Sequence, residues 1–160
     1  MGEKTATEAF WQEFCQLHGV APQARHDVFA FGDDPAVQNE LLDLVLHGPK
    51  RATAALVLEF EAAGDPLPVV GGHSVVLDGA GRPRCVIRTT EVRTVPFDRV
   101  DAAFAHDEGE DDRTLASWCR EHARCFARAC ARLGRTFTPD LPVVLERFEL
   151  VWAPDAGADG

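Results

Sequence analysis

The sequence has no tyrosine, a single methionine and no long run of apolar residues. A helix that crosses a bilayer needs about 20 consecutive apolar residues, so we expect no membrane span and no membrane partner. The first residues also lack the basic and then apolar pattern of a secretory signal. These absences predict a protein that stays in the cytoplasm, where it is made.

Cysteine pairs are missing as well. The five cysteines are an odd number, and none forms the Cys-x-x-Cys pair typical of zinc and redox-active sites. The pattern favours reduced and mostly buried thiols, as is usual in cytosolic proteins. We therefore expect a chain that folds without a disulfide or a structural metal.

Four familiar catalytic motifs are absent from the sequence: the P-loop, G-x-G-x-x-G, G-x-S-x-G and H-E-x-x-H. They belong to phosphate-binding loops, dinucleotide-binding folds, nucleophile elbows and zinc proteases respectively. Those enzyme classes are excluded. The lack of tyrosine also leaves no obvious aromatic platform on which nucleic acid bases could stack.

The charge balance is strongly acidic. Asp and Glu number 26 against 16 Lys and Arg, which gives a formal net charge of −10. A general nucleic-acid coat protein would be basic, so this class is not expected. A local basic site is still compatible with the balance, because acids and arginines concentrate in different segments.

The length of 160 residues and the apolar content of 46% predict one domain with a sizeable core. Periodicity and capping signals predict helices over residues 7–18, from Asp34 to Gly48, in the second part of 52–64 and over 112–133. Alternating patterns predict strands over 73–78, 84–95 and 142–152, and residues 20–34 are expected to form a loop. This mixture indicates an α+β fold.

The segment Gly48-Pro49-Lys50-Arg51-Ala52-Thr53 is the first candidate for chemistry. If the chain becomes extended after Gly48, Lys50 and Thr53 can both reach a cleft beside the helix end. They would supply a positive charge and a hydroxyl nucleophile or donor. The alternative is structural, since basic residues are favoured at helix C-termini for electrostatic reasons.

The acidic run Asp107–Asp112 is the second candidate. Its five acids exceed what helix capping needs. One carboxylate held near Lys50 could act as a general base, or the run could bind a hard cation such as Mg2+. The alternative is a solvated loop with Asp112 as the cap of the following helix.

Arginines recur at every fourth position of the long helix, at Arg120, Arg124, Arg128 and Arg132. Only Glu121 offers an acid within that helix, so this basic face is suited to phosphate recognition. The alternative is neutralisation by solvent or by the acidic N-terminal helices. His122 falls on the apolar face near Trp118, and we interpret it as a core residue rather than a ligand.

Taken in order, these pieces resemble the ASCH domain family over roughly residues 28–152. The resemblance rests on six motifs: GxKxxT (48–53), LP-x2-G (67–71), a strand pair (75–92), PF-x2-V (96–100), EGE-x-D-x-[ST]-L-x2-W-x3-H (108–122) and ERFEL (146–150). It resembles the longer bacterial subfamily, whose members carry extra N-terminal helices. Two positions depart from the usual pattern, since Asp111 replaces a glycine and Thr114 a serine.

The resemblance implies a PUA-like small β-barrel, mixed or antiparallel, surrounded by helices. It places an N-terminal helical extension at 1–27, packed on an ASCH domain at 28–152, and leaves a tail at 153–160 that we expect to be disordered. It also implies a role in RNA metabolism, with a cleft lined by the GxKxxT segment.

For function, the resemblance implies two enzymes. Short ASCH proteins include amidohydrolases that deacylate N4-acylated cytidine with a lysine, a threonine and a glutamate, which map to Lys50, Thr53 and either Glu108 or Glu110. Longer members are proposed ribonucleases on single-stranded RNA, assisted by a divalent cation such as Mg2+ or Mn2+.

We expect the ribonuclease, with Lys50 and a glutamate at the reacting phosphate. An amidohydrolase acting on N4-acetylcytidine-type nucleosides and a non-catalytic RNA-binding module are the alternatives. Five arginines are the candidates for phosphate contact: Arg51, Arg88, Arg120, Arg124 and Arg128.

Overall fold

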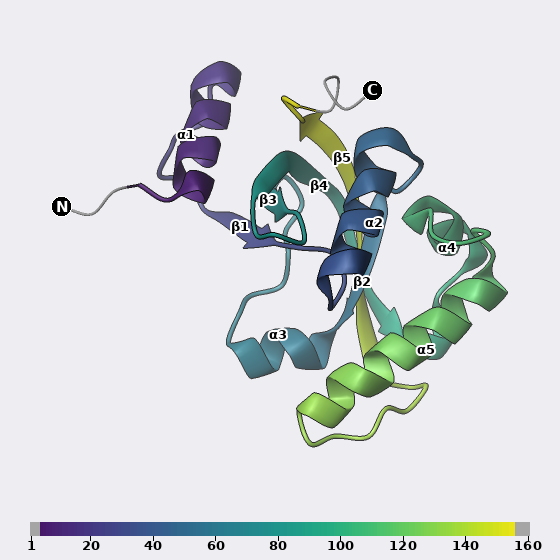
Figure 1. Cartoon of the computed structure of the whole chain (residues 1–160). Coiled ribbons are helices and arrows are strands. Elements are labelled where there is room, and N and C mark those ends of the chain that lie inside the picture. Colours follow the sequence, from purple (N-terminus) through teal and green to yellow (C-terminus); the bar gives the residue numbers. More distant parts are fainter. Residues whose placement is uncertain (1–3, 156–160) are drawn as a thin grey trace. The chain divides into compact units, whose positions relative to one another are not determined.

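The computed structural model describes residues 4–155. In chain order the elements are α1 (Ala6–His18), β1 (His26–Phe29), α2 (Pro35–His47), β2 (Ala52–Leu56), α3 (Val57–Ala63), β3 (His73–Leu77), β4 (Pro83–Pro96), a 3-10 turn (Phe97–Arg99), α4 (Ala102–Glu108), α5 (Leu115–Arg132) and β5 (Pro142–Trp152) (Figure 1). The predicted α+β class is confirmed.

The five strands form one mixed sheet in the order β1-β3-β4-β5-β2. β1 runs parallel to β3, whereas β3 pairs with β4 and β2 pairs with β5 in antiparallel fashion. β1 and β2 are edge strands, so the sheet is open, and the expected closed barrel is wrong in this one respect. β1 has only four residues, so it offers few backbone groups for the hydrogen bonds that would close the sheet into a barrel.

The chain divides into two compact units. Unit 1 consists of residues 4–48, 71–88 and 149–155, and unit 2 of residues 49–70 and 89–148. The core of unit 1 contains Trp11, Phe14 and Cys15 of α1, packed on Val75 and Val86 of the sheet. The strands β4 and β5 contribute residues to both units.

The core of unit 2 forms between α5, α4 and the strands β2 and β5. Along α5 the buried apolar side chains Trp118, Phe126 and Ala129 recur at helical spacing, and they belong to one cluster with Val143 and Leu145 of β5. The opposite face of α5 is left to polar residues. One helix therefore presents a buried face to the core and a charged face to solvent.

Most predicted elements are confirmed, and the corrections have local causes. The caps of α1 and α5 are Thr5 and Thr114, whose hydroxyls accept from backbone N–H groups, and Asp112 is not the cap of α5. The segment 20–34 was predicted as loop but contains β1, and α4 was not predicted. Of the predicted disordered tail, residues 156–160 lie outside the described part of the chain.

Two further expectations concern the whole described range. Among residues 4–155, no helix has the length and apolar character to cross a membrane. All five cysteines are free thiols, and three of them, Cys15, Cys85 and Cys130, are buried.

Candidate functional site

Lys50 lies in the short connection between α2 and β2 and is completely buried. Its Nζ atom donates to the backbone oxygen of Ala52 at 2.8 Å, to Glu110 at 2.6 Å and to Glu108 at 3.4 Å. These three acceptors match the three donors of an ammonium group. A buried charge of this kind is tolerated only when it is paired and hydrogen-bonded, so the position of Lys50 depends on the two glutamates.

A glycine turn brings both glutamates to Lys50. α4 ends at Glu108, and Gly109 follows in the left-handed conformation with φ of 71°. A Cβ atom on Gly109 would lie 2.8 Å from the backbone of Lys50, so the turn packs flat against that segment. The Arg51 amide also donates to the backbone oxygen of Asp107 at 2.8 Å. These contacts fix the turn on the lysine segment.

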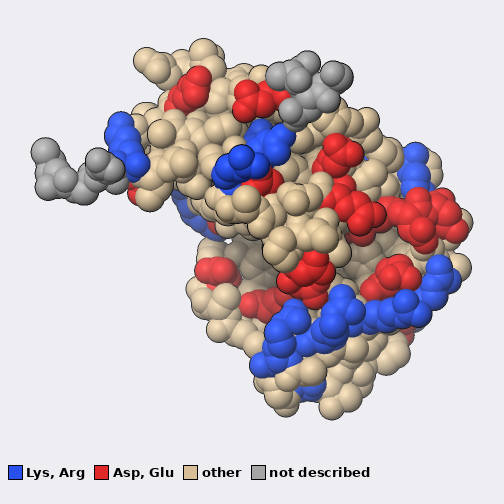
Figure 2. Space-filling model, viewed as in Figure 1, with Lys and Arg blue, Asp and Glu red and all other residues tan. Residues whose placement is uncertain are grey.

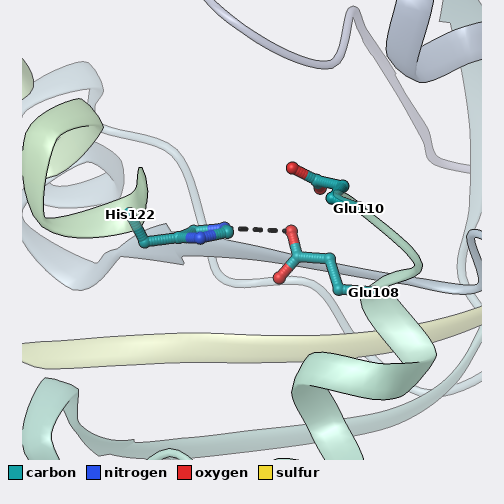
Figure 3. A group of neighbouring side chains, drawn as sticks. All are labelled: Glu108, Glu110 and His122. Atoms are coloured by element: carbon teal, nitrogen blue, oxygen red, sulfur yellow. Dashed lines mark hydrogen bonds and ion pairs between the residues drawn. The ribbon is translucent and has the colours of Figure 1, made fainter. Parts of the chain in front are cut away.

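Glu108 is held from α5 as well. Its Oε1 atom accepts from the indole Nε1 of Trp118 at 2.5 Å, and its Oε2 atom lies 3.2 Å from Nε2 of His122. Figure 3 shows the imidazole of His122 and the carboxylate of Glu108 pointing at one another, with Glu110 beside them. With Lys50 included, Glu108 has partners on both oxygens and is 2% exposed.

The electrostatics separate the two glutamates. Burial on its own would raise the pKa of Glu108, but attraction to His122 and Lys50 outweighs it and holds the pKa well below its usual value. For Glu110, burial dominates and the neighbouring Glu108 charge adds to it, so the pKa is raised in spite of Lys50. Glu108 is therefore held as an anion, whereas Glu110 takes up a proton more readily than Glu108 does.

The exposure of the side chains also distinguishes Glu110 from Glu108. The side chain of Glu110 is 25% exposed, whereas that of Glu108 is 3% exposed and that of Lys50 not exposed at all. Of the three predicted catalytic residues that the structure brings together, Glu110 is the one that solvent reaches most easily. We interpret it as the group that meets a substrate.

His122 was predicted to be a core residue, and it is buried as expected. Sequence reasoning missed that its ring also reaches Glu108, and it missed the indole of Trp118 as a donor to the same carboxylate. One signal was present in the sequence. Residues four apart on a helix share a face, so Trp118 and His122 had to point the same way, toward whatever α5 covers.

Thr53 is not joined to this cluster. It lies on β2 opposite Glu146 of β5, and because side chains alternate along a strand it faces away from Ala52 and the core of unit 2. Glu146 is buried and accepts from the Thr89 hydroxyl at 2.5 Å. Within residues 4–155, no hydrogen bond connects the Thr53 hydroxyl to Lys50, Glu108 or Glu110.

The arginine row of α5, defined as Arg120, Arg124, Arg128 and Arg132, is exposed on the outer face of the helix. Figure 2 shows basic side chains forming a continuous band at the position of α5. Arg120 lies 3.9 Å from Asp111 and 3.5 Å from Glu121, and Arg124 lies 3.6 Å from Glu121. These exposed pairs are long, so they are weak and easily exchanged.

The other two candidate arginines are engaged elsewhere. The guanidinium of Arg51 donates to the backbone oxygen of Lys50 at 2.6 Å. Arg88 belongs to unit 1, where its guanidinium pairs with Glu149 at 2.7 Å. The first contact lies within the GxKxxT segment, and the second lies within unit 1.

Asp111, the residue that replaces a glycine of the family pattern, adopts a glycine-like backbone. Its φ is 53°, in the left-handed region that Asp tolerates better than most residues. Its carboxylate accepts from the Ser117 hydroxyl in the first turn of α5. Asp111 thus adopts a backbone conformation that a glycine at this position would reach without strain.

Glu108, Glu110 and His122 each offer a metal-ligand atom, and these atoms lie within 4.8 Å of one another. A divalent cation among them would meet the ammonium of Lys50, which already lies 2.6 Å from Glu110. The Nε2 atom of His122 is also engaged with Glu108. The residues therefore do not fit a resident Mg2+ or Mn2+ ion while Lys50 stays in place.

Comparisons with known proteins agree with this architecture. The sequence model of the ASCH domain matches residues 27–152. The chain is 35% identical in sequence to a protein from Enterococcus faecalis V583 that is assigned to domain-of-unknown-function family 984. The crystal structure of that protein superposes with a TM-score of 0.86, and the match covers 97% of this chain and 93% of that one. A search of curated proteins gave no significant match.

A second solved structure, an ASCH domain from Lactobacillus crispatus JV V101, is 31% identical to the chain. The two superpose with a TM-score of 0.83, and the match covers 94% of this chain and 96% of that one. The chain therefore belongs to the ASCH domain family, which is linked in general to RNA binding.

Proposed function

We propose that this protein is a cytoplasmic ribonuclease that cleaves single-stranded RNA, with Glu110 as the proton-transferring group and Lys50 as its partner. The observation that carries the proposal is the Lys50–Glu110 pair: a half-buried carboxylate with a raised pKa, held 2.6 Å from a buried ammonium group. Carboxylates whose pKa is raised toward neutrality are typical of general acid–base catalysis. The free thiols fit a reducing compartment.

The reaction would use the 2′-hydroxyl of RNA as the nucleophile. Glu110 accepts the proton of that hydroxyl, its oxygen attacks the adjacent phosphorus, and the bond from phosphorus to the 5′-oxygen breaks. The leaving oxygen takes a proton from water, and a 2′,3′-cyclic phosphate remains. Once Glu110 is protonated, the ammonium charge of Lys50 is less fully neutralised, and that charge stabilises the negative charge that develops on the phosphoryl group.

The arginine row supports a polymeric substrate. The helix rises by about 1.5 Å per residue, so arginines four positions apart follow one another at about 6 Å along the axis. That spacing is of the order of the distance between neighbouring phosphates of an extended strand. Because α5 also carries Trp118 and His122 on its buried face, the row and the cluster share one helix within unit 2.

The first experiment offers the purified protein two substrates, a labelled single-stranded RNA and N4-acetylcytidine, with Mg2+ or with EDTA. Lys50→Ala is compared with Lys4→Ala, since Lys4 is the only other lysine in the sequence and is exposed. We expect RNA cleavage that falls at least about a hundredfold in Lys50→Ala and is unchanged in Lys4→Ala. Cleavage that survives in Lys50→Ala would contradict the proposal.

The second candidate is the amidohydrolase, and the net charge of −10 favours it, because a free nucleoside needs no basic track. Thr53 would then attack the acyl carbonyl. Release of cytidine from N4-acetylcytidine, lost in Thr53→Val but not in Thr89→Val, would establish this reaction. If neither substrate changes while RNA still binds in a salt-dependent way, the protein is a binding module.

A further inference from the structure

We propose that His122 is a positioning residue of this site, held as an imidazolium that fixes Glu108 as an anion and so leaves Glu110 as the carboxylate that exchanges protons. The proposal deepens the proposed function, since it assigns a role to a residue that was expected only to fill the core. It rests on geometry at both ring nitrogens.

The protonation state follows from the two partners of the ring. Nδ1 of His122 lies 2.9 Å from the backbone oxygen of Trp118, and Nε2 lies 3.2 Å from Oε2 of Glu108. A carbonyl oxygen accepts only, and an ionised carboxylate likewise accepts only. With Glu108 ionised, both ring nitrogens therefore donate, which makes the ring a cation.

The surroundings favour that cation. The imidazole is stacked on the indole of Trp118 with ring centroids 4.0 Å apart and planes inclined by 12°, and aromatic faces attract cations. Phe126 packs against the edge of the same ring. Although burial disfavours the charged form, the Glu108 carboxylate outweighs it and raises the pKa of His122.

Charge neutrality explains why the cluster needs this residue. The titratable groups that interact with His122 are Glu108 and Glu110, and Lys50 lies against both of them. Two cations and two carboxylates sum to zero. If His122 were neutral, the cluster would carry a surplus negative charge, and Glu110 would take up a proton more readily.

His122 does not have to touch the substrate to act. Trp118 and His122 occupy Glu108 from the α5 side, while Lys50 lies 3.4 Å from Oε2. A fixed Glu108 cannot compete with Glu110 for a substrate proton. Loss of His122 is therefore expected to lower kcat with little change in KM, because the substrate contacts themselves are retained.

The direct test is the protonation state of His122 in the wild-type protein, read from imidazole nitrogen-15 chemical shifts at pH 7.5. We expect two protonated nitrogens at His122. His106, an exposed histidine, is the reference residue in the same spectra. A single protonated nitrogen at His122 would overturn the proposal, whether or not the protein cleaves RNA.

A second measurement separates positioning from a structural role. In His122→Gln the side chain is neutral but still offers a donor, and we expect kcat for RNA to fall on the order of ten- to a hundredfold. The acidic limb of the pH–rate profile should move to higher pH. A profile that superposes on the wild type, with unchanged kcat, would also overturn the proposal, whereas absence of any RNA cleavage by the wild type contradicts only the proposed function.

Discussion

Each compact unit contains a tryptophan stacked on a histidine, and the two stacks have nearly the same geometry. In unit 1, Trp11 and His26 have ring centroids 3.9 Å apart with planes inclined by 17°. In unit 2, the values for Trp118 and His122 are 4.0 Å and 12°. The rings are alike, but what surrounds them differs.

In unit 2 the indole and the imidazole both face the carboxylate of Glu108. In unit 1 the indole of Trp11 donates to the backbone oxygen of Pro22 at 2.9 Å, and the ring of His73 lies nearby. Burial, Arg88, His18 and His26 lower the pKa of His73, whereas Glu108 raises that of His122 in spite of burial. The groups beside each imidazole therefore set the direction in which its pKa moves, and beside His122 the decisive group is the Glu108 carboxylate.

Removing that carboxylate should have the largest effect. In Glu108→Gln the cations Lys50 and His122 are left with Glu110 alone, and breaking a buried ion pair costs about 3–5 kcal/mol. We expect a loss of this size in the free energy of unfolding, measured with urea. The matched control is Glu149→Gln, whose exposed pair with Arg88 should contribute at most about 1 kcal/mol. Equal losses in the two variants would contradict the account.

The turn that delivers Glu108 offers the next test. Gly109 and Gly64 have nearly equal φ values of 71° and 69°, but only at Gly109 would a Cβ atom collide with a backbone. Gly64→Ala should cost about 1–2 kcal/mol for its left-handed backbone alone. Gly109→Ala should cost about 2–4 kcal/mol, because the contact with Lys50 adds an overpacking penalty. Thermal unfolding of the two variants measures both losses in stability. An equal or smaller loss in Gly109→Ala than in Gly64→Ala would contradict this explanation of the turn.

The two indoles can be compared directly by replacing each with phenylalanine. Trp118→Phe removes a donor to a charged carboxylate, so we expect a loss of about 1.5–3 kcal/mol. Trp11→Phe removes a donor to a neutral carbonyl oxygen, and the expected loss is about 0.5–1.5 kcal/mol. Urea unfolding of both variants tests the order. A larger loss at Trp11 would mean that the Glu108 carboxylate is not the decisive partner.

The smallest expected effect is on pH dependence, and it has opposite signs in the two units. Because the pKa of His122 is raised, its stabilisation is full below the unfolded value of about 6.5 and is lost as pH rises through the folded pKa. The pKa of His73 is lowered, so its contribution is present above that value and is lost as pH falls through the folded pKa. In urea unfolding, His122→Gln should therefore lose more free energy of unfolding at pH 6 than at pH 9. His73→Gln should lose more free energy of unfolding at pH 8 than at pH 5.

Local signals were sufficient for much of the fold. Asp34 and Pro35 mark the start of α2, and the apolar repeat from Trp118 to Phe126 marks α5. β1 was missed because its four residues carry no buried alternation. α4 was missed because acids 107 and 108 were assigned to a loop, although Asp101 caps the helix from six residues earlier.

The site was predictable in its residues but not in its connections. Lys50, Glu108 and Glu110 could be named from the family motifs, yet the pairing of residues about 60 positions apart is a tertiary fact. The helical period put His122 on the buried face of α5, but nothing local revealed that a carboxylate would meet it there. For Thr53 the motif was misleading. Its spacing from Lys50 suggested that the two side chains meet, but side chains alternate along β2, and that of Thr53 points away from the lysine cluster.

The central claim is that Glu110 and Lys50 cleave RNA through its own 2′-hydroxyl. The most direct measurement uses a DNA oligonucleotide that contains a single ribonucleotide, incubated with the wild type, Glu110→Gln and Glu149→Gln. The account predicts one cut, directly after the ribonucleotide, with a 2′,3′-cyclic phosphate end, made by the wild type and Glu149→Gln and slowed at least about a hundredfold in Glu110→Gln. Cleavage of the all-deoxy oligonucleotide, or an unchanged rate in Glu110→Gln, would contradict it.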